Sequence, residues 1–342
     1  MRITRTLAVV AVAALATGLA ACSTAPADGD NAGPAAEGVF PVTVEHAFGE
    51  TTVDAQPERV ATVAWANHEV PLALGIVPVG MSKATWGDDD DNGILPWVED
   101  KLAELGGEEP VLFDETDGID FEAVADTQPD VILASYSGIT QEDYDTLSKI
   151  APTIAYPEVP WATSVDDMIE MNCTALGLEA EGEALIDDLH AQVEEALAAN
   201  PGLEGKKAMF AFMDPSDFSQ IGYYTLNDTR PGFLEEFGLP QPQLVEESTE
   251  GSDQFYLTVS AEQAESLQDV DVFVTYGDPN GELIAQMQAD PLLSKIPAIA
   301  DGRIAILEES TPLAASANPS PLSIPWGIND YFEVLATAAS AG

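Results

Sequence analysis

Aromatic and polar side chains recur in this sequence where short apolar runs give way to loops. In open α/β sheets, ligands bind outside the carboxyl ends of the strands, and rings there suit a bulky, mostly apolar ligand with scattered polar groups. For any one of these residues, packing in the core is an equally good explanation, so the prediction depends on the whole set. The candidate ligand-binding residues are Trp65, Asn67, Thr85, Trp86, Ser135, Tyr136, Trp161, Tyr223, Tyr224, Tyr256, Tyr276 and Trp326.

The chain lacks the short motifs that carry much hydrolase, nucleotide-binding and metalloprotease chemistry, namely Gly-x-Ser-x-Gly, Gly-x-Gly-x-x-Gly, the P-loop and His-Glu-x-x-His. Its three histidines, His46, His68 and His190, do not form a ligand-spaced set, which disfavours a zinc or manganese carrier built on clustered histidines. A general base among the acidic residues stays open, because nothing singles one out. We therefore expect a binding protein, not an enzyme, with no required cofactor.

One acidic segment matches the spacing of a calcium loop. Asp88, Asp90 and Asn92 alternate before Gly93, and Glu99 follows at the final ligand position. This pattern predicts a Ca²⁺ site with those four oxygen-bearing side chains as ligands. The alternative is an acidic loop that leads into a helix over 96–105 and interacts favourably with the positive end of its dipole.

Strand and helix patterns alternate along most of the chain, which predicts α/β architecture with a mostly parallel sheet in each half. Two helices, 165–176 and 179–199, follow each other with only Gly177 to break them. We therefore expect an N-terminal lobe over 41–178, an interlobe helix over 179–200 and a C-terminal lobe over 201–342. The expected strands are 42–48, 51–53, 59–65, 77–81, 111–113, 131–135, 153–156, 207–213, 221–225, 272–276 and 304–307.

A weak internal repeat supports two equivalent lobes. Asp120 and Ser260 each occupy a helix-capping position before a short helical pattern that leads into a strand. Capping explains these two residues but not the glutamates two positions further on, Glu122 and Glu262. The alternative for both glutamates is an ordinary charged residue in the first turn of a helix.

The N-terminus has the pattern of a secreted lipoprotein. Residues 1–21 carry two basic residues and then an apolar run too short to span a membrane, as in a signal peptide. Cys22 ends a lipobox and is the predicted lipidation site, which would anchor the protein to the outer face of the cytoplasmic membrane. Residues 22–40 read as a flexible tether. An ordinary cleaved signal peptide is the alternative, and Cys173 is expected to be a buried apolar residue.

The net charge is extreme. The chain has 11 basic and 60 acidic residues, a formal net charge of −49. Nucleic acids and anionic lipid headgroups are repelled by such a surface, so neither is an expected partner. A well-solvated monomer is the simplest expectation.

The order and spacing of several segments resemble the iron–siderophore and cobalamin binding proteins of ABC importers. The segments that carry the resemblance are 46–53, 56–60, 73–80, 120–132, 213–216 and 258–260. The resemblance covers residues 40 to 338 and implies the class III periplasmic binding protein fold: two Rossmann-like α/β lobes joined by a single long α-helix. It also implies that the ligand lies between the lobes, and that Glu122 and Glu262 dock onto arginines of an ABC permease dimer, which works with its ATPase.

The sequence departs from that family in its scarcity of basic residues. Siderophore binders commonly place arginines in the cleft, whereas here only Arg230, and with it Lys83, is available, and the segment 114–117 is acidic. Burying an anionic ferric tris-catecholate without counter-charges would be costly, whereas ferric hydroxamates are neutral or cationic. The resemblance therefore predicts delivery of a ferric siderophore, with the hydroxamate type favoured.

Other functions stay open at this point. A haem or cobalamin carrier of the same fold would also use an aromatic cleft, and haem would take an axial ligand such as Tyr136, Tyr223, Tyr224 or Tyr276. A cell-surface hydrolase and an adhesion or sensing lipoprotein are further alternatives outside the transport class.

Overall fold

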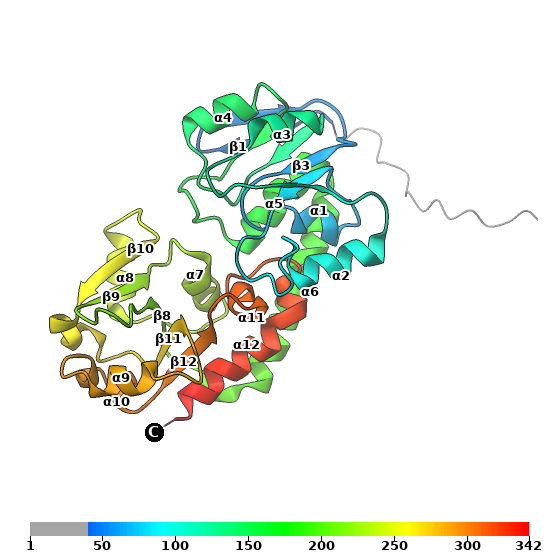
Figure 1. Ribbon diagram of the computed structural model, residues 1–342. Helices are drawn as coiled ribbons and strands as arrows, with labels where there is room; N and C mark the ends of the chain where they lie inside the picture. The colour runs from blue at the N-terminus through cyan, green and yellow to red at the C-terminus, as the bar shows by residue number, and fades with distance from the viewer. Residues whose placement is uncertain (1–39, 342) are drawn as a thin grey trace, which may run out of the picture. The chain divides into compact units, whose positions relative to one another are not determined.

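The first half of the protein contains a five-stranded parallel sheet, with helices in the connections between its strands (Figure 1). A computed structural model describes residues 40–341. The order β5-β4-β3-β6-β7 places the first strand in the middle, as in a Rossmann-like sheet. A separate antiparallel hairpin, β1 and β2, precedes this sheet. The strands are β1 (Val42–His46), β2 (Gly49–Val53), β3 (Val60–Thr62), β4 (Gly80–Ser82), β5 (Val111–Phe113), β6 (Val131–Leu133) and β7 (Thr153–Ile154).

Helices between these strands complete the N-terminal half. Several begin and end at clear sequence signals: Ser164 caps the helix that follows it, and Gly177 ends that helix in the left-handed conformation. The expected bounds 96–105, 111–113, 165–176 and 179–199 are confirmed, while most other strands are shorter than expected. The helices are α1 (Glu69–Ala73), α2 (Pro96–Leu105), α3 (Phe121–Asp126), α4 (Gln141–Leu147), α5 (Val165–Leu176) and α6 (Glu179–Ala199).

The second half has a mixed sheet in the order β10-β9-β8-β11-β12. Strands β8, β11 and β12 are parallel, but β9 runs antiparallel to both of its neighbours. The mostly parallel sheet expected here is therefore wrong at one edge, because the short β8–β9 connection permits only a hairpin. Strand β10 was not expected at all. The strands are β8 (Ala208–Phe212), β9 (Gln220–Tyr224), β10 (Tyr256–Ser260), β11 (Val272–Gly277) and β12 (Ile304–Glu308).

Short helices flank this mixed sheet, and one long helix ends the described chain. The segment 261–267 is helical as expected, but it is a 3₁₀ segment with non-helical dihedral angles at Gln263. The helices are η1 (Pro201–Leu203), α7 (Thr229–Glu236), α8 (Gln243–Glu250), η2 (Ala261–Leu267), α9 (Leu283–Ala289), η3 (Leu293–Lys295), α10 (Pro297–Ala300), α11 (Pro312–Ser316) and α12 (Ser323–Ala339).

The two halves are linked by more than α6. Helix α12 packs along α6, so a second helix braces the connection (Figure 1). Helices α5 and α6 approach closely at Gly182, where an added Cβ would lie 2.8 Å from Sγ of Cys173. Cys173 itself is buried, and burial raises the pKa of its thiol to about 12, which confirms the expected apolar role. Residues 40–341 belong to one compact unit, and the lobe boundaries at 178 and 200 stay a prediction.

A buried carboxylate holds the N-terminal half to the start of α12. Glu69 in α1 accepts a hydrogen bond from Nε1 of Trp97 at 2.8 Å and another from the backbone N–H of Leu322 at 2.9 Å. The side chain is almost fully buried, and burial raises its pKa. We call this group the Glu69 latch, because it connects α1, α2 and α12.

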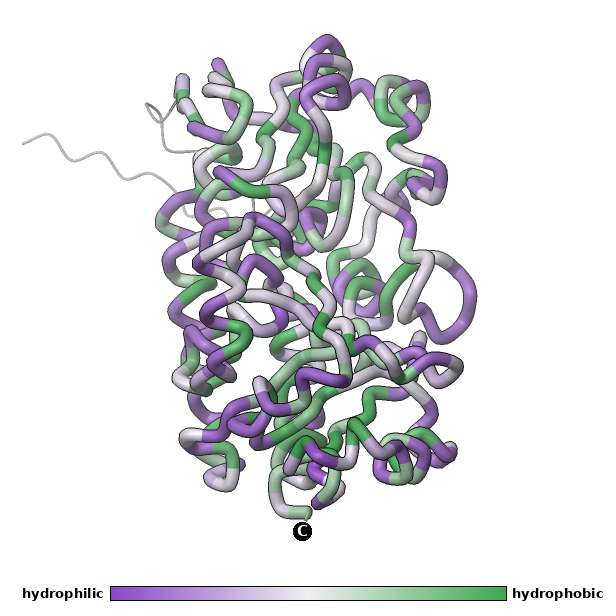
Figure 2. The backbone as a smooth tube through the Cα atoms, turned by 90° about the vertical axis from the view of Figure 1, so that its left-hand side faces the viewer, coloured by the Kyte–Doolittle hydropathy of each residue, from purple (hydrophilic) through white to green (hydrophobic). Residues whose placement is uncertain are grey.

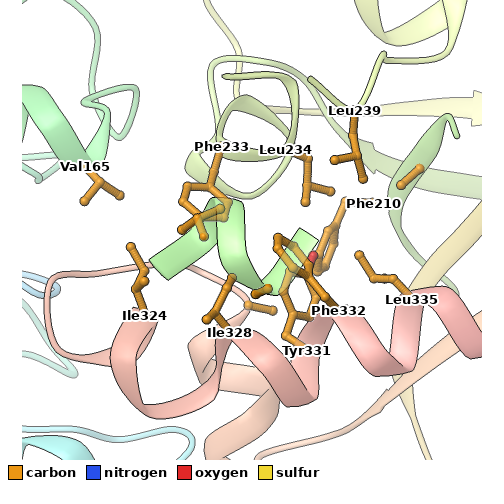
Figure 3. Close-up of a cluster of buried hydrophobic side chains, with 14 of the residues drawn as sticks. Val165, Phe210, Phe233, Leu234, Leu239, Ile324, Ile328, Tyr331, Phe332 and Leu335 are labelled. Atoms are coloured by element: carbon orange, nitrogen blue, oxygen red, sulfur yellow. The ribbon is translucent and has the colours of Figure 1, made fainter. Parts of the chain in front are cut away.

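Hydrophobic residues gather inside the protein and hydrophilic ones around it (Figure 2). The largest buried cluster crosses between the halves: Val165 of α5 lies in one cluster with Phe233 of α7 and Ile324 of α12 (Figure 3). Within residues 40–341, no helix has the length and apolar character to cross a membrane. The expected signal peptide, lipidated Cys22 and nearly all of the tether lie outside the described residues.

Candidate ligand-binding site

The side chains of β9 alternate between the two faces of its sheet, which separates two tyrosines that the sequence grouped together. Tyr223 points into the core, where its hydroxyl lies 2.7 Å from that of Ser248 in α8. Tyr224 points to the other face, where its ring packs edge-on against Tyr256 at 5.2 Å. Successive side chains of a strand always diverge in this way. Tyr223 is therefore a core residue, whereas Tyr224 and Tyr256 belong to the candidate site.

Arg230 organises the aromatic side chains on that face. Its guanidinium lies 3.8 Å from the ring centre of Tyr224 and donates a hydrogen bond to the Tyr276 hydroxyl at 3.2 Å. The same guanidinium binds both carboxylate oxygens of Asp228, each at 2.7 Å. Asp228 is 3% exposed and Arg230 16% exposed, so this is a largely desolvated bidentate ion pair. The charge of Arg230 is thus already balanced within the protein.

Two contacts bring rings of the N-terminal half to this group. Trp86 packs edge-on against Tyr276 with ring centres 5.4 Å apart. Tyr136 packs edge-on against Trp161 at 5.5 Å, and Nδ2 of Asn318 donates to its hydroxyl at 3.2 Å. Burial and the negative charge of Asp228 raise the pKa of Tyr136. We call the combined set the aromatic cluster: Trp86, Tyr136, Trp161, Tyr224, Arg230, Tyr256 and Tyr276.

A pocket of about 320 Å³ adjoins this cluster at Trp86; residues of the N-terminal half line it, together with Ser310 of the second half. Its size is at the lower end of the roughly 300–1,000 Å³ typical of small-molecule sites. Thr85, exposed as a ligand contact requires, is part of its lining, as expected from the sequence. The lining residues are Lys83, Ala84, Thr85, Trp86, Gly87, Asp88, Asp91, Gly93, Asp114, Thr116 and Ser310.

The charge balance of the pocket is negative. Asp88, Asp91 and Asp114 line it together with one cation, Lys83, whose Nζ lies 4.0 Å from Asp114. Because Asp228 neutralises Arg230, the aromatic cluster adds no free positive charge. The site as a whole is therefore suited to a neutral or cationic ligand.

Two predicted ligand residues support the site without reaching it. Asn67 and Ser135 are fully buried, and the Ser135 hydroxyl donates to the Asn67 side chain at 3.1 Å. The Asn67 amide also donates to the carbonyl oxygens of Val63 and Tyr136, at 2.9 Å each. These bonds fix the loop that carries half-buried Trp65, in which Ala64 and Ala66 have positive φ values of 61° and 62°. Non-glycine residues rarely adopt such values, so the loop depends on these contacts.

Trp326 differs from the other predicted aromatic residues. It is 40% exposed on α12, and its ring packs on Trp97 at 5.1 Å beside the Glu69 latch. It lies in the contact between α2 and α12 and is not among the rings that surround Arg230. Its position at a predicted helix start gave no sign of which neighbour it would meet.

Glu115 is a functional candidate that sequence reasoning missed. Both of its carboxylate oxygens accept from the backbone N–H of Ala64, at 3.0 and 3.2 Å. Glu115 therefore stabilises the strained loop that carries Trp65. Burial raises the pKa of Glu115 to about 7, against the opposing effect of its hydrogen bonds to Ala64 and Ser82. The sequence did not distinguish Glu115 from the other acidic residues around it.

The raised pKa of Glu115 predicts a pH-dependent stability. A carboxyl group whose pKa is raised on folding contributes stability fully below its unfolded value, about 4.5, and loses that contribution as the pH rises through about 7. The wild type should lose this stability on going from pH 5 to pH 8, whereas Glu115→Gln should not. The free energy of unfolding of the variant, relative to that of the wild type, should therefore rise by about 1–3 kcal/mol between the two pH values. Thermal melting at both pH values checks this, with exposed Asp117→Asn as the matched control. An equal difference at both pH values would contradict it.

The acidic segment 88–99 folds as a loop closed on itself. Asp88 accepts from the backbone N–H of Asp90 and Gly93, and Asp90 accepts from that of Asn92. The amide of Asn92 in turn donates to Glu99. We therefore assign these four side chains to the loop's own hydrogen bonds, and the predicted Ca²⁺ site finds no support in their arrangement. The alternative, an acidic loop leading into α2, fits these contacts.

The two glutamates of the internal repeat occupy equivalent positions. Glu122 follows Asp120, whose side chain accepts from the N–H of Ala123. Glu262 follows Ser260, whose hydroxyl accepts from the N–H of Glu262. Both glutamates are exposed in the first turn of their helices. Their role in docking stays a prediction.

This chain belongs to the periplasmic binding protein family, whose pattern it matches over residues 60–311. It is 47% identical to PiaA of Streptococcus pneumoniae TIGR4, whose structure was solved in complex with ferrichrome. The match covers 88% of this chain and 100% of PiaA, with a TM-score of 0.83. It is 31% identical to the probable siderophore-binding lipoprotein YfiY of Bacillus subtilis, over 68% of this chain and 67% of YfiY. It is 25% identical to the iron(3+)-hydroxamate-binding protein YxeB of the same organism, over 67% and 65%.

The family assignment confirms the two-lobed class III fold and a binding rather than catalytic function. The family is the one that the resemblance of its segments indicated.

Proposed function

We propose that this protein binds a ferric siderophore of the hydroxamate type at the aromatic cluster and the adjoining pocket. The observation that carries the proposal is the charge of the site: Asp228 neutralises Arg230, and three aspartates outnumber Lys83 around the pocket. An anionic tris-catecholate would be repelled there, whereas a neutral or cationic hydroxamate complex would not. The resemblance to the ferrichrome-bound PiaA and to YxeB supports the same ligand class.

The proposed delivery route uses the surface and the N-terminus of the chain. Lipidated Cys22 would hold the protein on the outer face of the cytoplasmic membrane, in keeping with the lipoprotein YfiY. Glu122 and Glu262 would orient the loaded monomer on an ABC permease dimer, whose ATPase drives release into the cell. Charge pairs of this kind steer and orient partners more than they add affinity.

Tryptophan fluorescence tests the ligand class directly. Trp86 and Trp161 lie in the aromatic cluster, so an iron-loaded ligand bound there should quench their emission. We expect quenching by ferric hydroxamates, with ferric tris-catecholate binding at least about a hundredfold more weakly, which corresponds to about 2.7 kcal/mol. Haem and cobalamin complete the panel as the alternative ligands. Tight binding of the tris-catecholate without hydroxamate binding would refute the proposal.

A pair of neighbouring variants locates the site. Tyr224→Ala should weaken hydroxamate binding about tenfold, because it removes the ring on which Arg230 stacks. Tyr223→Phe is the matched control, since this ring faces the core on the opposite side of β9. Equal affinities of both variants and the wild type would place the ligand elsewhere.

Haem is the less favoured ligand on the geometry of the tyrosines. The hydroxyl groups of Tyr136, Tyr223 and Tyr276 are already engaged in hydrogen bonds. Burial also raises the pKa of Tyr136 and Tyr276, which disfavours the phenolate that an axial ligand requires.

A further inference from the structure

Three metal-ligating side chains converge away from the ligand site, where elements of both halves meet. Asp166 lies in the first turn of α5, His190 in the middle of α6 and Glu236 at the end of α7. One ligand atom from each lies within 4.8 Å of the other two. We propose that this triad binds a divalent transition metal ion of the Zn²⁺ type and thereby ties the two halves together.

The separations in the triad suit a tetrahedral ion. Nε2 of His190 lies 2.9 Å from Oδ2 of Asp166 and 3.8 Å from Oε1 of Glu236. In a tetrahedral site with bonds of about 2.0–2.1 Å, ligand atoms lie about 3.3 Å apart. These two distances bracket that value, and all three ligand atoms lie within 4.8 Å of one another, so side-chain movements alone would bring them around one ion. A water molecule would occupy the fourth position.

The charges of the triad call for a cation. Two carboxylates, Asp166 and Glu236, lie beside a single imidazole, that of His190. Two carboxylates this close repel each other unless a proton or a metal ion lies between them. The side chains are 27% to 36% exposed, which leaves a path for an ion to enter from solvent.

The ligand types select the metal. An imidazole nitrogen with two carboxylates suits Zn²⁺ and related ions, whereas Ca²⁺ and Mg²⁺ prefer all-oxygen sites. The ring of Phe237 packs edge-on against His190 at 5.0 Å and an angle of 79°, which fixes the imidazole orientation. The other acidic group, Asp88, Asp89 and Asp90, offers oxygens alone and serves as an internal comparison.

The position of the triad gives the ion a structural role. Helices α5 and α7 belong to opposite halves, and α6 connects them. Val165, next to Asp166, and Phe233, one helical turn before Glu236, already lie in one hydrophobic cluster (Figure 3). A metal ion would add a polar link above this cluster, independent of the siderophore ligand.

Calorimetric titration of the purified, EDTA-stripped full chain with ZnCl₂ tests the proposal. We expect one tight equivalent in the wild type, a rise in Tm that EDTA reverses, and an X-ray absorption spectrum with a single imidazole ligand. His190→Gln and Glu236→Gln should each weaken this binding at least tenfold. Glu195→Gln, exposed elsewhere on α6, and the double change D88N/D90N should leave it unchanged.

Two results would overturn the proposal. One is the absence of a stoichiometric zinc equivalent in the wild type. The other is unchanged tight binding in His190→Gln, which would show that zinc associates with the acidic surface in general. Melting curves measured without metal establish that each variant is folded. Glutamine is chosen at position 190 because it keeps a hydrogen-bonding side chain and so favours a folded variant. Siderophore binding is measured in parallel. Its loss or retention tests the proposed function, whereas zinc binding tests the triad, so the two results can be told apart.

Discussion

Replacement of Glu69 by alanine is expected to lower the free energy of unfolding by about 3–5 kcal/mol. The change leaves the N–H groups of Trp97 and Leu322 buried without their acceptor and opens a cavity in a packed contact. Since the free energy of unfolding of a natural protein is only about 5–15 kcal/mol in total, this loss is a large fraction of its stability. Chemical denaturation at neutral pH measures it.

The Glu69 latch also predicts where the damage appears. Hydrogen exchange should accelerate first at the Leu322 amide and the start of α12, because that is the contact between the halves that the carboxylate holds. Trp97→Phe removes a single donor and should cost less, about 1–2 kcal/mol. Asp100→Asn, exposed on α2, is the control and should change neither quantity. A neutral effect of Glu69→Ala would show that the latch contributes nothing to stability.

Local sequence signals were sufficient for the helices with clear ends. Ser164 and Gly177 delimit α5, and Pro96 and Gly106 delimit α2, so their bounds could be predicted from the sequence. The edge strand β10 has no alternation of buried and exposed residues, and its pairing with β9 comes from the tertiary fold. A pattern confined to the segment itself could not have shown it.

The site was predictable as a set but not in its internal division. The sequence indicated which rings occur at strand ends, and six of them form the aromatic cluster together with Arg230. Consecutive residues of the expected strand 221–225 must point to opposite faces, but the sequence could not show that Tyr223 faces the core and Tyr224 the site. The sequence could not indicate Glu69, Glu115 or the proposed metal triad for another reason. Each depends on residues distant in sequence, such as Glu69 and Leu322, which are 253 positions apart.

Charge reversal at the repeat glutamates is expected to reduce transport strongly without affecting ligand binding. In the double variant E122K/E262K, two exposed carboxylates that we propose pair with permease arginines become like charges. Such juxtapositions cost several kcal/mol, and each 1.4 kcal/mol is about tenfold in an equilibrium constant. We therefore expect uptake of iron from the ferric siderophore to fall at least about tenfold in cells that express this variant as their sole copy. Tryptophan quenching by the same siderophore should be unchanged, because both residues lie on capped helices outside the aromatic cluster.

The matched control separates docking from general electrostatics. E142K/E246K reverses two exposed glutamates in the first turns of α4 and α8, one in each half, and changes the net charge by the same amount. If the whole acidic surface attracted the permease, both double variants would reduce uptake equally. If Glu122 and Glu262 are the docking pair, only their reversal should matter, and the effect should weaken as salt screens the charges. Normal uptake by E122K/E262K would show that the repeat marks two helix starts and no interface.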